Sequence, residues 1–154
     1  MLRTLKDLFD TFAGPAAESP QAQDHALKLA TAVLLVEVMR ADPQGGAGER
    51  QAVLGSLQVK FALRDDELAR LFELAEQTAR TASDYHQFTS RLNDRFSHPQ
   101  KILIVEHMWQ VAYADEHLHA NENHLISKIS GLLHVTHGEY IGAKLRAKET
   151  AHLT

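Results

Sequence analysis

The sequence contains no cysteine among its 154 residues. This absence excludes disulfide bonds, thiolate metal ligands and a cysteine nucleophile, and it is typical of proteins from a reducing cytoplasm. Basic residues are not in excess either. The chain has 16 Lys and Arg and 20 Asp and Glu, which gives a formal net charge of −4. An acidic chain lacks the basic surface that nucleic-acid backbones require. We therefore expect no nucleic-acid partner.

Long apolar runs are missing as well. No stretch approaches the roughly 20 apolar residues that are needed to cross a bilayer. The N-terminal segment "MLRTLKDLFDTFAG" lacks the apolar core of a signal peptide, because Lys6, Asp7 and Asp10 interrupt it. We expect a soluble, cytoplasmic protein.

The N-terminal segment is separate from the rest in composition. Apolar residues recur at helical spacing in residues 1–13, which predicts a short amphipathic helix. Residues 14–24 are rich in Pro, Ala and small polar residues and are typical of a linker. We expect the helix to dock on the domain that follows over residues 25–150. Contact with a partner or peripheral association with a membrane is the alternative.

From about residue 20 the apolar spacing is helical throughout, and no segment alternates with the period of a strand. Ser19 and Pro20 are suited to begin a helix, and the apolar segment "HALKLATAVLLVEVMRAD" is expected to be buried and to end near Pro43. The pairs Ser97/Gln100 and Thr136/Glu139 have the form of capping boxes. The predicted fold is all-α, a compact bundle of about seven to eight helices.

The chain also repeats itself. The segment "VEVMRADPQGGAGERQAV" aligns with "WQVAYADEHLHANENHLI", so that Asp42 corresponds to Asp115 and Glu49 to Glu122, each 73 positions later. Further on, "LRDDELARLF" aligns with "VTHGEYIGAK" at an offset of 72. Two copies are too few for a repeat array. We interpret the pattern as a duplicated helical unit that packs on itself about a pseudo-two-fold axis.

The two segments "LLVEVMRAD" and "HMWQVAYAD", each with a Glu seven positions after its Asp, resemble the two halves of the TerB-like family, named after the tellurite-resistance protein TerB. The resemblance covers roughly residues 25–148. It implies a compact helical bundle with internal symmetry, and a role in tellurite and general stress response without an established catalytic activity. One departure is that Pro43 and Glu116 follow the loop Asp, where the family usually has Gly.

The repeated carboxylates are the candidate metal ligands. A loop Asp and a Glu in the first turn of the next helix can converge on one point, and hard cations take such oxygen ligands. Asp42 with Glu49, and Asp115 with Glu122, are thus predicted to bind a divalent cation, calcium or magnesium rather than zinc. In either loop alone, helix capping and the helix dipole would explain the Asp and the Glu without an ion.

Two further carboxylates, Glu37 and Glu106, lie on the long segments before the two loops and are predicted as auxiliary ligands. They are not equivalent in the repeat, since Gln110 corresponds to Glu37. The second loop also carries His117 and His119, and His124 follows two residues after Glu122; these imidazoles would favour zinc, nickel or copper over calcium. The first loop has no counterpart to these histidines.

Motifs of catalysis are not found: the chain has no P-loop, dinucleotide fingerprint, nucleophile elbow or HExxH sequence. Trp109 and Tyr113 are predicted to pack in the core where the two halves meet. We expect a binding or scaffolding module with a protein partner and no organic cofactor, not an enzyme. The alternatives are a metal-free adaptor that uses the N-terminal helix and, third, a carboxylate-metal hydrolase.

Overall fold

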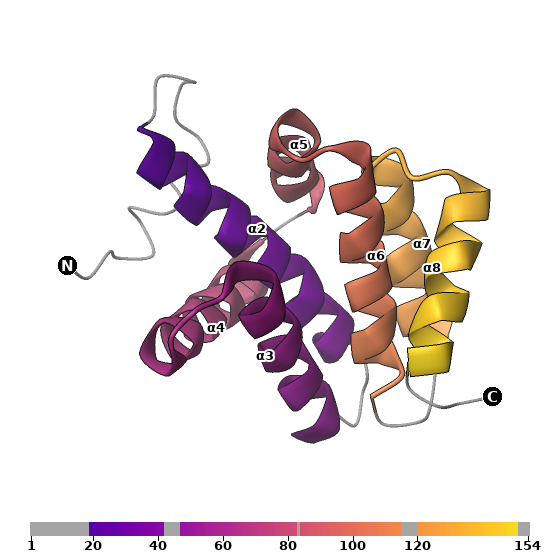
Figure 1. The fold of residues 1–154 in the computed structure, drawn as a ribbon, viewed down its shortest axis with the longest axis horizontal. Coiled ribbons are helices and arrows are strands. Elements are labelled where there is room, and N and C mark those ends of the chain that lie inside the picture. The colour runs from indigo at the N-terminus through magenta and orange to yellow at the C-terminus, as the bar shows by residue number, and fades with distance from the viewer. Residues whose placement is uncertain (1–18, 42–46, 83, 115–119, 151–154) are drawn as a thin grey trace.

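The structure, a computed structural model, describes residues 19–41, 47–82, 84–114 and 120–150. These residues form seven helices and no strand (Figure 1). The helices are α2 (Pro20–Arg40), α3 (Ala47–Phe61), α4 (Asp65–Thr81), α5 (His86–Arg95), α6 (His98–Ala112), α7 (Ala120–Leu132) and α8 (His137–Thr150). The predicted all-α fold and helix number are confirmed. The predicted helix over residues 1–13 lies outside the described residues, and α2 begins within the segment predicted as a linker.

Helix α2 is the centre of the molecule. Every residue from 30 to 36 is fully buried, as the apolar sequence of this segment predicts. Full burial of a Val or Leu side chain contributes roughly 1.5–3 kcal/mol, so this stretch is a large part of the core. Helices α3, α4, α5, α6 and α7 all contact α2. The helix ends at Arg40, just before Pro43, where the sequence predicts its end.

Helix α6 is the second buried helix, and α8 packs against it. Trp109 is fully buried and Tyr113 nearly so, which confirms their predicted place in the core. The ring of Trp109 stacks on that of Tyr113 with centroids 5.9 Å apart and lies 5.4 Å from that of Tyr140 in α8. The aromatic neighbour from another helix is thus Tyr140, which belongs to the same half of the chain.

The helix starts follow the predicted caps. The Ser19 hydroxyl accepts a hydrogen bond from the Ala22 amide at 3.1 Å, and Pro20 occupies the first helical position. At the start of α6 the Gln100 amide donates to the Ser97 hydroxyl, while the Ser97 amide donates to the Gln100 side chain at 2.8 Å. These reciprocal bonds satisfy amides that the helix leaves without partners. Both predicted capping boxes are confirmed, since the same bonds are formed ahead of α8.

The turns between the second and third helices of the two halves have the same backbone conformation. Ala62, between α3 and α4, has φ 51°, and His134, between α7 and α8, has φ 63°. The two positions are 72 apart, which is the sequence offset in this region. Each is followed by a buried apolar residue, Leu63 or Val135, each 8 % exposed. This correspondence is what the predicted duplication requires.

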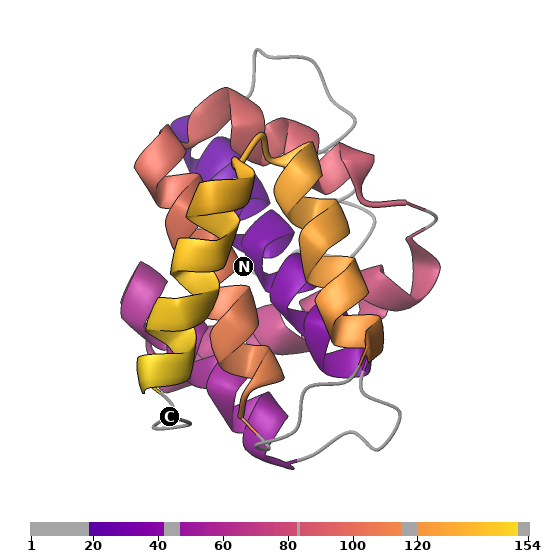
Figure 2. The same cartoon turned by 90° about the vertical axis from the view of Figure 1, so that its right-hand side faces the viewer.

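The helix contacts of the two halves also correspond. The first long helix, α2, packs against α4, and the second, α6, packs against α8. The helix after each loop contacts the long helix of the other half, because α3 contacts α6 and α7 contacts α2. Helices α7 and α8 cover one side of the molecule, with α2 and α6 behind them (Figure 2). Helices α3 and α7 also contact the long helix of their own half. The ends of α2 and α6 and the starts of α3 and α7 lie at one end of the molecule (Figures 1 and 2).

Helix α5 lies between the halves in sequence and joins them in space. Its Asn93 side chain donates to the Leu132 carbonyl of α7 at 2.9 Å and accepts from the Lys101 amino group of α6 at 3.1 Å. Lys101 is only 8 % exposed, so its charge depends on this contact for part of its solvation. The asparagine thus links three helices around one buried ammonium group.

Candidate functional site

Glu49 and Glu122 are the most unusual of the predicted ligands. Each is the third residue of its helix, α3 or α7, and each is fully buried, with 0 % exposure. Removal of a carboxylate from water costs several kcal/mol unless other groups or an ion replace its solvation. The loop partners predicted for them, Asp42 and Asp115, lie outside the described residues. Where those two side chains lie relative to the glutamates therefore stays a prediction.

Helix capping by itself does not require this burial. Glu67 and Glu139 are also third residues of their helices, and each accepts a hydrogen bond from the backbone amide three residues before it, at 3.0 and 2.9 Å. Their side chains are nevertheless 48 % and 32 % exposed. The same helical position thus carries exposed carboxylates in α4 and α8 and fully buried ones in α3 and α7.

The starts of α3 and α7 lie against the ends of the opposite long helices. A Cβ on Gly48, next to Glu49, would approach the Ala114 carbonyl oxygen at the end of α6 to 3.2 Å. A side chain at position 48 would therefore crowd the backbone of the other half. In the corresponding place, Asn121 at the start of α7 and Ala41 at the end of α2 line one pocket. Both glutamates thus belong to helix turns that approach the other half of the chain.

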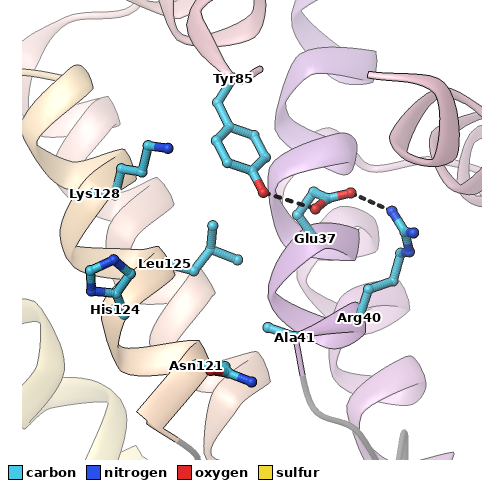
Figure 3. Close-up of a pocket in the computed structure, with 8 residues that line it drawn as sticks. All are labelled: Glu37, Arg40, Ala41, Tyr85, Asn121, His124, Leu125 and Lys128. Carbon is cyan, nitrogen blue, oxygen red and sulfur yellow. Dashed lines mark hydrogen bonds and ion pairs between the residues drawn. The ribbon is translucent and has the colours of Figure 1, made fainter. Parts of the chain in front are cut away.

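Glu37, predicted as an auxiliary ligand, has other partners in the structure. Its Oε1 accepts from the Arg40 guanidinium at 2.6 Å, and its Oε2 accepts from the Tyr85 hydroxyl at 3.0 Å (Figure 3). Burial and the adjacent Glu37 carboxylate raise the pKa of Tyr85 to about 12, so the phenol is protonated and donates at neutral pH. A cation at Glu37 would have to compete with both of these hydrogen bonds.

Glu106, the other auxiliary ligand, is also engaged. Its Oε1 accepts from the Arg146 guanidinium of α8 at 2.6 Å, and its side chain is 17 % exposed. The bond joins α6 to α8, so Glu106 contributes to the contact between these two helices. The described geometry gives it a role as an ion-pair partner.

The histidines give no transition-metal centre within the described part of the chain. His117 and His119 lie outside it, and His124 is exposed on α7. Among the described residues, no group of three or more His, Cys, Asp or Glu side chains is placed to hold a metal ion. A metal site at the two buried glutamates would therefore need further ligands from residues 42–46 and 115–119 or from water.

A second polar site, which the sequence analysis did not identify, lies between α2 and α7. We call it the α2–α7 groove, and its volume is about 540 Å³. Figure 3 shows the α2 residues on one side and the α7 residues on the other, with Tyr85 above them. The lining residues are Glu37, Arg40, Ala41, Tyr85, Asn121, His124, Leu125 and Lys128. The four lining residues from α7 are spaced three or four positions apart or are adjacent, so they share one face of that helix. The sequence does not indicate that α2 supplies the opposite wall.

The fold and the buried carboxylates together define a small all-α domain built around two long helices. Residues 28–145 match the family model described as "Tellurite resistance protein TerB". Because the match covers most of the chain, the protein belongs to the TerB family, and the predicted resemblance is confirmed. Comparison with curated proteins and with solved structures gives no significant match. Within the described residues, no helix is long and apolar enough to cross a membrane.

Proposed function

We propose that this TerB-family chain is a non-catalytic binding module of the tellurite and stress response, which binds a divalent cation at Glu49 and Glu122. The observation that carries the proposal is the full burial of these two carboxylates at corresponding positions of α3 and α7. Capping does not account for it, because Glu67 and Glu139 cap their helices while exposed. The TerB family is generally not a family of catalytic enzymes.

The donor chemistry favours a hard cation. Carboxylate oxygens suit calcium or magnesium, while zinc prefers imidazole and thiolate ligands, and the chain has no cysteine. In this proposal Glu49 and Glu122 provide buried oxygen ligands, and Asp42 and Asp115 complete them from the loops. Cation binding would add a favourable charge interaction at two carboxylates that are buried away from water.

The proposed consequence of binding is coupling between the two halves. The first turns of α3 and α7 lie against the opposite long helices, as the approach of Gly48 to the Ala114 carbonyl shows. An ion held near these turns would link the two halves of the molecule and present a defined surface to a protein partner. The alternative from the sequence, a metal-free adaptor that uses residues 1–13, needs no such ion.

The proposal is tested by calorimetric titration of the full chain with calcium, magnesium, manganese and zinc. We expect calcium or magnesium to bind at up to millimolar concentration and to raise the melting temperature. The charge-removing double variant Glu49→Gln with Glu122→Gln should weaken this binding at least about tenfold, because it removes both buried negative charges from the proposed site. The matched control is Glu67→Gln, which removes the same charge from the same helical position at an exposed site.

Two results would contradict the proposal. One is the absence of heat and of a thermal shift with every ion at millimolar concentration, which would favour the metal-free adaptor. The other is equal loss of binding in Glu67→Gln and in the double variant. That result would mean that the ion binds through the overall negative charge of the protein and not at a specific site.

A further inference from the structure

The α2–α7 groove is cationic although the chain as a whole is acidic. Arg40 and Lys128 bring positive charges to opposite walls, and Glu37 is the one acidic residue in the lining. The two oxygens of Glu37 already accept hydrogen bonds from Arg40 and Tyr85. A second cation therefore gains little from this carboxylate, and Arg40 keeps guanidinium donors that its bond to Glu37 does not use.

The α7 wall presents three polar side chains to the groove. Asn121, His124 and Lys128 are exposed, and no hydrogen bond or ion pair to another described residue is formed by their polar ends. They recur with Leu125 at steps of three and four residues, so they share one face of α7. Glu122 lies on the buried side of the same helix. The groove is thus separate from the two buried glutamates, although it begins beside the same turn.

Aromatic contact holds Lys128 over the groove. Its amino group lies 5.6 Å from the centroid of the Tyr85 ring, and the Tyr85 hydroxyl is fixed by its bond to Glu37. A cation over an aromatic face keeps its charge available to a ligand on its other side. The tyrosine therefore positions both cations of the groove: Lys128 through its ring and Arg40 through their shared carboxylate, Glu37 (Figure 3).

We propose that the α2–α7 groove binds the phosphate group of a small molecule, with Lys128 as its charged contact. The Lys128 ammonium offers a point charge with three donors, which suits a phosphate oxyanion. Arg40 lies beyond Glu37 on the other wall, where it can contact the rest of the molecule (Figure 3). Asn121 and His124 add donors from the α7 wall. A volume of about 540 Å³ lies within the range of small-molecule sites, so the groove has room for more than the phosphate itself.

The test is a titration of the full, isotope-labelled chain with inorganic phosphate, followed by NMR at constant ionic strength. A chelator is present throughout, so that no divalent ion takes part and the result is independent of the proposed cation site. We expect saturable shifts of the amides of Ala41, Asn121, His124, Leu125 and Lys128. Lys128→Gln should weaken binding about tenfold, which corresponds to the loss of one charge-assisted hydrogen bond.

Lys148→Gln is the matched control, because it removes the same charge from an exposed site on α8. It should change phosphate affinity less than about twofold. A parallel titration with glycerol phosphate distinguishes the source of the group: tighter binding than inorganic phosphate indicates an organic phosphate, and equal binding indicates the free ion. The proposal is overturned if chloride at the same ionic strength gives the same shifts, or if Lys148→Gln weakens binding as much as Lys128→Gln.

Discussion

Tyr85 shows how a single side chain organises the polar surface between α2 and α7. Its hydroxyl donates to Glu37, and its ring lies under the Lys128 amino group. Burial and the Glu37 charge raise the pKa of Tyr85 from its ordinary value of 10.0 to about 12. The folded protein therefore holds the phenolic proton more tightly than the unfolded chain does.

This difference predicts how stability depends on pH. The contribution of Tyr85 is fully present below pH 10 and is lost as pH rises from about 10 to about 12, because the unfolded chain releases the proton first. Tyr85→Phe should therefore destabilise the protein less at pH 11 than at pH 9, as measured by denaturant unfolding at both values. When Glu37→Gln is already present, the difference between the effects of Tyr85→Phe at pH 9 and pH 11 should be smaller. An unchanged or larger effect at pH 11 would mean that Glu37 does not hold the phenol.

For single residues, the sequence indicates the two repeated glutamates but not the α2–α7 groove. The repeat singles out Glu49 and Glu122, because residues that recur at one offset stand out in a single chain. Their burial could not be predicted, since Glu67 and Glu139 occupy the same helical position and are exposed. Burial depends on which helix packs over the first turn. The groove was missed as a site for the same reason, because its walls come from helices far apart in the chain, although the sequence singles out Glu37 and His124 as candidate metal ligands.

At the scale of elements, the two corresponding turns carry strain that glycine would relieve. Ala62 and His134 have φ values of 51° and 63°, in the left-handed region. There the Cβ of an L-residue costs roughly 1–2 kcal/mol, and glycine avoids this contact. Glycine also gives the unfolded chain more freedom, which offsets part of the gain.

We expect His134→Gly to raise the free energy of unfolding by about 0.5–1 kcal/mol, since His134 is exposed and its side chain is not part of the core. Ala62→Gly should act in the same direction. The control is Ala69→Gly, at an exposed position inside α4, which should lower the free energy by about 1 kcal/mol. Chemical denaturation measures all three. Destabilisation by both turn variants would show that the two turns are not strained.

The helix limits illustrate what local sequence determines. Ser97 with Gln100, Thr136 with Glu139, and Ser19 before Pro20 predict helix starts correctly, because each cap involves neighbours in the chain. The left-handed turns were not predicted, because neither Ala62 nor His134 carries the usual glycine signal. The contact of Trp109 with Tyr140 was not predicted either, since it depends on how α8 packs against α6.

At the scale of the whole molecule, the second helix of each half, α3 or α7, contacts the long helices of both halves. The ends of α2 and α6 and the starts of α3 and α7 lie at one end of the bundle. We infer that a duplicated unit produced this arrangement, because sequence offsets, helix contacts and turn conformations correspond in the two halves. Glu122 and the α2–α7 groove then lie on different faces of the same helix, α7.

The central claim is that Glu49 and Glu122 hold a divalent cation, and the most direct measurement is anomalous diffraction from crystals grown with manganese. Manganese prefers the same oxygen ligands as calcium and magnesium, and its anomalous signal identifies its position. We predict an anomalous peak within about 2.6 Å of an oxygen of Glu49 or Glu122. Crystals grown with millimolar manganese that show no peak at either carboxylate would contradict the account.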